Sequence, residues 1–89
     1  AGPGYGGSCF PKDTLALLAT ADQAGVPLGI VGAAAAANER RKQAMADRVI
    51  AACDGSVAGK IVAVLGLTFK PNTDDMRDSP SLDIVPALC

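Results

Sequence analysis

The sequence contains no histidine, and this absence removes a large part of enzyme chemistry. Without an imidazole, no Ser-His or Cys-His pair forms within this chain. Tryptophan is also absent, and aromatic residues make up only 3% of the chain. Cys9, Cys53 and Cys89 are widely spaced and match no zinc-binding pattern. The sequence therefore predicts no metal site, and any nucleophile must be activated by something other than histidine.

Charge and hydropathy argue against two classes of partner. The 89 residues carry a formal net charge of −1, so no broad basic surface is expected and nucleic acid is not a predicted partner. The longest apolar stretch, residues 26–37, is too short and too rich in glycine and alanine to span a bilayer. Three cysteines are an odd number and too few for a secreted disulfide scaffold. We therefore expect free thiols, a cytoplasmic location and no membrane association.

The chain is short of material for a core of its own. Hydrophobic residues make up 49% of it, but alanine inflates that figure, and small side chains bury little area. The sequence opens at Ala1 without a methionine and stops at Cys89 inside a predicted helix. We expect an internal piece of a longer protein that depends on a partner chain or on further sequence.

Turn and cap signals predict two helices in the first part of the chain. A glycine-rich loop over 1–8 is followed by a helix over 12–24, where Leu15 and Leu18 lie on one apolar face. Asp13 either caps this helix or places negative charge in its first turn. Gly25 ends it, because glycine adopts the left-handed conformation readily.

A second helix is predicted over 30–52, about 35 Å long and long for so small a chain. Its basic run, Arg40 to Lys42, is interpreted as a solvated face. Residues that are small or apolar, apart from one arginine, recur every four positions and predict a stripe that a second copy of the chain would cover. This stripe comprises Ala37, Arg41, Met45, Val49 and Cys53, widened by Ala34, Ala44 and Ile50.

The last third of the sequence predicts a strand, a loop and a helix. The β-branched run over 61–67 is typical of a strand buried on both faces, as in a parallel sheet. Ser79 and Pro80 form a typical helix start, with serine as the cap and proline in the first turn. The predicted fold is therefore mainly α with a short β-α unit at the start of a doubly wound α/β domain.

Three interpretations remain open for the glycine-rich loop. Gly2, Gly4 and Gly7 match the G-x-G-x-x-G pattern of dinucleotide-binding folds. That pattern needs a strand before it and a helix directly after it, and neither is predicted here. The loop is otherwise either a flexible connection or a backbone surface that lies against a ligand without side-chain hindrance.

Cys9 is the sharpest candidate for chemistry. The thiolate is the reactive form of cysteine, and it is favoured near helix N-termini and beside lysine. Cys9 lies just before the start of a predicted helix, with Lys12 three residues on and Asp13 able to take a proton from water. The alternative is a small buried hydrophobic residue, the commonest role of a free cysteine.

A second candidate lies in the loop after the predicted strand, between Lys70 and Arg77. This loop is either a solvated surface loop or a ligand-binding segment, because open α/β sheets bind ligands at the carboxyl ends of their strands. A cation at that edge suits a phosphate or a sugar hydroxyl. The loop's aspartates match no calcium-binding spacing.

Two segments resemble motifs of the UDP-glucose/GDP-mannose dehydrogenase family, and among its members those of the UDP-glucose 6-dehydrogenases. GPGYGGSCFPKD is similar to that family's catalytic-cysteine loop, and VAVLGLTFKPNTDDMRDSPSLDIV to the start of its nucleotide-sugar-binding domain. The resemblance implies a central helical dimerisation domain over 1–55, joined to a truncated Rossmann-like α/β domain over 56–89. Phe10 and the run Lys70 to Thr73 favour UDP-glucose over other nucleotide sugars.

The resemblance also implies a reaction, in which NAD takes two hydrides from UDP-glucose to give UDP-glucuronate. A thiohemiacetal and then a thioester form on the cysteine. The resemblance implies that Cys9 is the nucleophile and that Asp13 assists the attack of water. The implied cofactor contacts are Lys12 and Arg77. The implied substrate contacts are Gly2, Gly6, Phe69 and Lys70.

Alternatives to this enzyme remain. One is a related dehydrogenase of GDP-mannose or another UDP-sugar, and another is a helical dimerisation module without activity of its own. The family's N-terminal NAD-binding domain is missing from the 89 residues. We therefore expect the chain alone to bind NAD weakly or not at all and to show no turnover.

Overall fold

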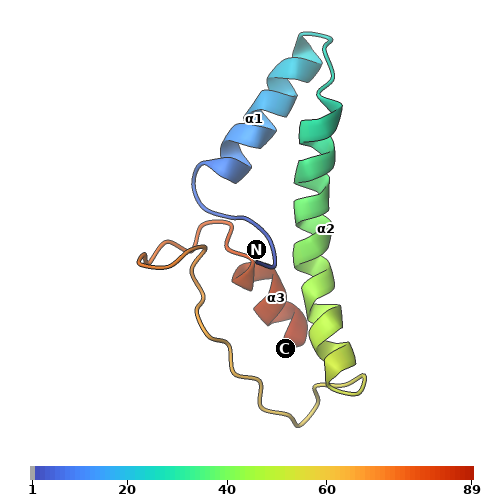
Figure 1. Ribbon diagram of the computed structural model, residues 1–89, viewed down its shortest axis with the longest axis vertical. Coiled ribbons are helices and arrows are strands. Elements are labelled where there is room, and N and C mark those ends of the chain that lie inside the picture. The colour runs from blue at the N-terminus through green and yellow to red at the C-terminus, as the bar shows by residue number, and fades with distance from the viewer. Residues whose placement is uncertain (1) are drawn as a thin grey trace.

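The computed structural model describes residues 2–89, in which the chain forms three helices (Figure 1). Helix α1 spans Phe10–Gln23, α2 spans Gly29–Ala52 and α3 spans Ser81–Leu88. Helices α1 and α2 are joined by a short turn and diverge from it, while α3 packs beside the second half of α2. The long helix α2 is the central element, since both other helices contact it. The prediction of a mainly helical chain is confirmed.

The ends of α1 follow from local sequence. Gly25 has a φ of +70°, and the N–H of Val26 donates to the carbonyl of Ala21, which together close the helix as predicted. At the other end the helix begins at Phe10, two residues earlier than predicted, and the Cys9 carbonyl accepts from the N–H of Asp13. Asp13 lies in the first turn and does not cap the helix. Its charge therefore acts on the helix N-terminus only through proximity.

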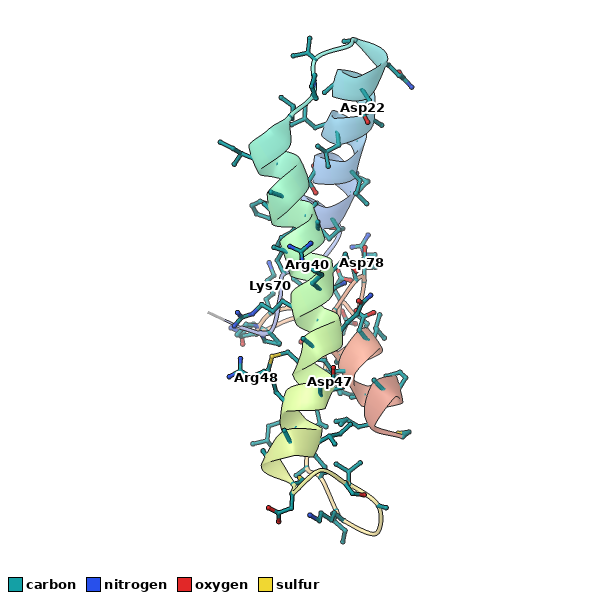
Figure 2. All side chains as sticks on the ribbon, turned by 90° about the vertical axis from the view of Figure 1, so that its right-hand side faces the viewer. Asp22, Arg40, Asp47, Arg48, Lys70 and Asp78 are labelled. Atoms are coloured by element: carbon teal, nitrogen blue, oxygen red, sulfur yellow. The ribbon has the colours of Figure 1, made fainter. Side chains whose placement is uncertain are left out.

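The bounds predicted for α2 are confirmed to within one residue, but its buried face is not the predicted one. The buried residues are Asn38, Lys42 and Ala46, which lie four apart along one side of the helix. The predicted stripe is one position out of register with them and is exposed or half-buried. Arg40 and Arg48 are exposed, as expected of a solvated face (Figure 2).

Lys42 is a correction to the predicted solvated run, because it is only 5% exposed. Its ammonium lies 3.0 Å from Glu39 Oε1 and 3.2 Å from Asp83 Oδ2 of α3. Burial by itself lowers the pKa of Lys42, but the hydrogen bonds to Glu39 and Asp83 outweigh it and the pKa is raised. A charged residue therefore joins α2 to α3 at a position where a solvated face was expected.

We expect Lys42→Ala to lower the free energy of unfolding of the intact protein by about 1–3 kcal/mol. The change leaves Asp83 without its cation and removes a packed stem, whereas Lys42→Met keeps most of the packing and should cost less. Because the pKa of Lys42 is raised, its stabilisation is present below the ordinary value of 10.5 and is lost as pH rises through the raised value. Thermal unfolding between pH 7 and pH 11 measures both effects. Equal stability of the alanine and wild-type proteins at pH 7 would contradict the role of the ion pair.

The strand predicted over 61–67 does not form within residues 2–89, where the segment runs as irregular chain (Figure 1). A strand needs a neighbouring backbone for its N–H and C=O groups, and in the described part of the chain no segment pairs with this one as a strand. Its apolar side chains are open to solvent, with Ile61 100% and Leu65 95% exposed. The predicted β-α unit is therefore represented only by its helix.

Ser79 has a different role from the predicted cap. The N-cap residue directly before α3 is Pro80, and no side chain caps this helix. Ser79 is only 1% exposed. Its hydroxyl donates to the Leu67 carbonyl at 2.6 Å, and the hydroxyl of Ser81 donates to the same carbonyl. The two serines thus tie the end of the irregular segment to the beginning of α3.

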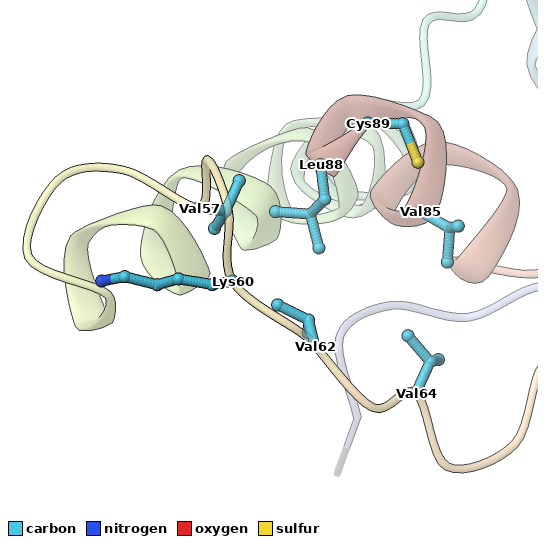
Figure 3. A pocket seen from close by; sticks show the side chains of 7 residues that line it. All are labelled: Val57, Lys60, Val62, Val64, Val85, Leu88 and Cys89. Carbon is cyan, nitrogen blue, oxygen red and sulfur yellow. The ribbon is translucent and has the colours of Figure 1, made fainter.

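Apolar burial is small throughout the described residues, where Ala46 is the one hydrophobic residue classed as buried. An open hollow of ≈ 220 Å³ separates the irregular segment from α3 (Figure 3). It is lined mainly by Val57, Val62, Val64, Val85 and Leu88 and contains none of the predicted site residues. In residues 2–89, no helix combines the length and the apolar character that crossing a bilayer requires.

Candidate functional site

The glycine-rich loop before α1 lies against α2. The N–H of Tyr5 donates to Asn38 Oδ1 at 2.7 Å, and Asn38 Nδ2 donates to the Tyr5 carbonyl at 3.1 Å. Gly4 approaches so closely that a Cβ there would lie 2.7 Å from Lys42 Cγ. Arg41 Nε adds a bond of 3.1 Å to the Gly2 carbonyl. One side of the loop is therefore held by a row of α2 residues.

The other side of the loop meets the segment that precedes α3. The N–H of Gly7 donates to the Arg77 carbonyl at 2.7 Å, and Gly7 has a φ of +92°. A Cβ at Gly7 would lie 2.7 Å from the ring of Phe69, and one at Gly6 would lie 2.1 Å from the Asp78 carbonyl oxygen. These glycines are required by the close approach of other parts of the chain. That packing favours neither the flexible connection nor the dinucleotide fingerprint.

Cys9 lies at the N-terminal end of α1 with its thiol exposed, so in this structure it is not buried as a hydrophobic residue would be. The hydroxyl of Ser8 is 3.7 Å from the Cys9 sulfur. An open hollow of ≈ 530 Å³ adjoins the thiol and is lined by Gly7, Ser8, Cys9, Lys12, Arg77 and Asp78. Two segments that are far apart in the sequence thus meet at one cysteine.

Arg77 is held beside this hollow by Asp75. Its Nη2 lies 2.8 Å from Asp75 Oδ2, and its Nε lies 3.0 Å from Asp75 Oδ1. The same Oδ1 accepts from the backbone N–H of Arg77 at 2.9 Å. These bonds lower the pKa of Asp75 to about 2 and raise the pKa of Arg77. The guanidinium is therefore fixed in orientation, with part of its charge already neutralised.

Lys12 and Asp13 form an exposed pair, with 3.7 Å between the Lys12 ammonium and Asp13 Oδ1. Lys12 lines the same hollow as Cys9. Asp13 lines a separate apolar hollow of ≈ 270 Å³, to which Cys9, Phe10, Thr14 and Leu17 also contribute. Cys9 therefore borders two surfaces, one that carries the cations of Lys12 and Arg77 with the carboxylate of Asp78, and an apolar one that carries the carboxylate of Asp13.

The predicted substrate residues are divided between two places. Gly2 and Phe69 line a third hollow of ≈ 410 Å³, and a Cβ at Gly2 would meet nothing within 4 Å. Lys70 is exposed, with its ammonium 5.3 Å from the centroid of the Phe69 ring. None of these four residues lines the Cys9 hollow, although Gly6 lies against the Asp78 carbonyl and the Phe69 ring lies against Gly7.

This arrangement suits covalent chemistry on an electrophile attached to an anionic group. The Cys9 sulfur is an exposed nucleophile at a helix N-terminus, and the Lys12 and Arg77 cations that line the same hollow attract phosphate. Backbone groups of the glycine loop line the hollow without side chains that would obstruct a ligand. Lys12, Arg77 and Gly7 are the residues placed to hold a phosphate-bearing cofactor or substrate.

Comparison with known proteins identifies the family to which the chain belongs. Residues 1–40 match the model of the central domain of the UDP-glucose/GDP-mannose dehydrogenase family, and residues 63–89 match that of its UDP binding domain. The two matches are in the order of the chain and together cover about three quarters of it. The chain belongs to the UDP-glucose/GDP-mannose dehydrogenase family.

Individual members of this family are similar along almost the whole chain. A UDP-glucose 6-dehydrogenase of Rhizobium meliloti (strain 1021) is 61% identical over 88 residues, which are 99% of this chain and 20% of that protein. The UDP-glucose 6-dehydrogenase TuaD of Bacillus subtilis (strain 168) is 50% identical, and that of Pseudomonas aeruginosa PAO1 is 47% identical, each over 99% of this chain and 19% of the relative. The chain spans about a fifth of the length of the curated relatives it matches.

Sequence reasoning missed the residues that hold this dehydrogenase loop in place. The composition of α2 is typical of a surface helix and did not single out Asn38 or Lys42. Asparagine is nevertheless unfavourable in the interior of a helix unless its side chain has a hydrogen-bond partner. That Asn38 follows five alanines was the available signal. Asp75 was one of several aspartates, and its pairing with Arg77 two residues later was not distinguishable by spacing.

Proposed function

We propose that this chain supplies the catalytic loop and the first part of the UDP-sugar domain of an NAD-dependent UDP-glucose 6-dehydrogenase. The observation that carries the proposal is the exposed Cys9 thiol in a hollow lined by Lys12 from α1 and Arg77 from the segment before α3. The names of the similar proteins support UDP-glucose as the substrate. Within this proposal residues 1–55 belong to the central domain and 56–89 to the UDP-sugar domain.

The reaction converts a primary alcohol into a carboxylate, which requires the loss of two hydrides. NAD, when bound, accepts them. Once the alcohol has become an aldehyde, the Cys9 thiolate adds to its carbon and the resulting alkoxide takes a proton, which gives a thiohemiacetal. Loss of the second hydride and of the hydroxyl proton leaves a thioester on Cys9. Water then attacks the thioester carbon, the carbon–sulfur bond breaks, and the Cys9 thiolate and the carboxylate are released.

The proposed roles of the other residues follow from where they lie. Asp13, close to Cys9 along the apolar hollow, assists the attacking water. Lys12 and Arg77 contact the cofactor, since two cations beside an open hollow fit its phosphates. Gly2, Gly6, Phe69 and Lys70 contact the UDP-sugar, and the close packing of Gly6 and Phe69 against the cysteine loop supports their part in this assignment.

The experiment that tests this function uses the full-length protein that contains the chain. UDP-glucose with NAD is expected to give two molecules of NADH for each molecule of UDP-glucuronate, read at 340 nm and by mass spectrometry. GDP-mannose and UDP-N-acetylmannosamine are expected to be oxidised at least about 100-fold more slowly, because Phe10 and Lys70 follow the UDP-glucose pattern. The 89-residue chain alone serves as the inactive control. A preference for either competing sugar, or turnover by the chain alone, would contradict the proposal.

We further propose that the enzyme is a cytoplasmic homodimer formed through α2. The stripe predicted from the sequence is left open in the chain, with Ala37 and Arg41 exposed and Met45, Val49 and Cys53 half-buried. Free thiols suit a reducing compartment. The second candidate function is a dimerisation module without activity. It would use the same α2 surface but would not oxidise UDP-glucose. Light scattering separates a dimer from a monomer, and the NADH assay separates the two functions.

A further inference from the structure

We propose that Asn38 is a positioning residue that fixes the Cys9 loop from helix α2, an inference that rests on the proposed function. Its amide makes both bonds to a single loop residue, accepting from the N–H of Tyr5 at 2.7 Å and donating to the Tyr5 carbonyl at 3.1 Å. This is the pairing that one strand would offer another, supplied here by a side chain. Asn38 is 7% exposed, so both bonds are shielded from water.

The amide is required because it presents a donor and an acceptor side by side. Alanine at this position would leave the N–H and C=O of Tyr5 without these partners. An aspartate would keep the acceptor and place a second oxygen opposite the Tyr5 carbonyl. In the interior of a helix, asparagine costs helix propensity relative to alanine, which is the residue at the five preceding positions. The two hydrogen bonds to Tyr5 offset this loss of helix propensity.

The geometry transmits this restraint to the thiol. Tyr5 is four residues before Cys9, and Gly7 between them is bonded to the Arg77 carbonyl at 2.7 Å. Gly4, on the other side of Tyr5, rests on the Lys42 stem. The loop is thus held on α2 at Tyr5 and on the segment before α3 at Gly7, and it has little freedom left when it reaches Cys9. Release of the Asn38 bonds leaves contacts with α2 at Gly2 and Gly4, which are farther from Cys9 along the chain than Tyr5 is, and the thiol would move.

The test compares Asn38→Ala with Gln43→Ala in the full-length dehydrogenase. Gln43 is an exposed amide on the same helix, away from the loop, and its loss should leave kcat within twofold of wild type. Asn38→Ala is expected to lower kcat about 10- to 100-fold, since a displacement of about 1 Å at the reacting atoms is enough for such a loss. KM for UDP-glucose should change less than about threefold, because Asn38 acts through the loop on a step after binding.

A second readout is independent of the sugar reaction. The rate of Cys9 alkylation by iodoacetamide, followed by mass spectrometry of the Cys9 peptide, should fall at least about threefold in Asn38→Ala and stay unchanged in Gln43→Ala. If circular dichroism shows that the alanine variant does not fold, Asn38→Asp replaces it, because aspartate keeps the volume and the acceptor. Both kcat and the alkylation rate are then also expected to fall.

The outcomes separate the two proposals. Wild-type protein that fails to reduce NAD with UDP-glucose overturns the proposed function, and the alkylation comparison then still tests whether Asn38 places the thiol. Active wild-type protein in which the folded Asn38 variant keeps both kcat and the alkylation rate within twofold overturns the role of Asn38. Equal losses in the Asn38 and Gln43 variants overturn it as well, because a general effect on α2 would then explain them.

Discussion

Replacement of Cys9 by serine in the full-length protein is expected to lower the rate of UDP-glucuronate formation by at least about 1,000-fold. A cysteine sulfur is intrinsically far more nucleophilic than a serine hydroxyl, and the 89 residues contain no histidine that could act as a base for a serine at this position. Without the sulfur adduct the aldehyde is not converted into a second hydride donor. Mass spectrometry of the products at equal enzyme concentration measures the loss.

Cys89→Ser is the matched control for this change. Cys89 is also an exposed free thiol, but it lies at the end of α3 beside the apolar hollow of Figure 3, and it lines no hollow shared with Cys9. This variant should form UDP-glucuronate at a rate within twofold of wild type. A normal rate in Cys9→Ser, or an equal loss in both variants, would remove Cys9 from the centre of the mechanism.

Features that depend on neighbours in sequence were predictable. Gly25 closes α1 through bonds to residues in the preceding turn, and the bounds of α2 follow from its composition. The placement of Cys9 before a helix, with Lys12 in the first turn, is equally local. For this part of the molecule, intrinsic propensity and tertiary packing favour the same structure.

Features that depend on distant contacts were not predictable from spacing. Lys42 is buried because Asp83 and the Gly4 backbone happen to meet it, and nothing within α2 distinguishes it from Arg41. The run 61–67 has the composition of a strand, but the described residues offer it no strand to pair with. Ser79 does not cap α3 as predicted, and its hydroxyl donates to the Leu67 carbonyl instead. Asp83, the partner of Lys42, and Leu67, the partner of Ser79, each lie twelve or more residues away in the sequence.

Gly6→Ala is the second change with a large expected effect, and its cause is steric. The added Cβ would lie 2.1 Å from the Asp78 carbonyl oxygen, so the two backbones must separate by about 1.3 Å to reach an ordinary contact of 3.4 Å. Asp78 already has a φ of 49°, a region in which residues with a side chain have little freedom. The loop that carries Cys9 and the segment that carries Arg77 would therefore move apart. We expect kcat/KM for UDP-glucose to fall about 100-fold.

Two further glycine variants show whether this loss is due to the clash. Gly29→Ala lies at the start of α2, where a Cβ meets nothing within 4 Å, and it should leave activity unchanged and stability equal or slightly higher. Gly2→Ala lies in the same loop as Gly6 with open space around it, so its loss should be at least about tenfold smaller than that of Gly6→Ala. Equal losses at Gly2 and Gly6 would mean that the loop needs glycine for its flexibility. A loss confined to Gly6 would mean that the Cys9 loop and the Arg77 segment must touch for the two halves of the site to act together.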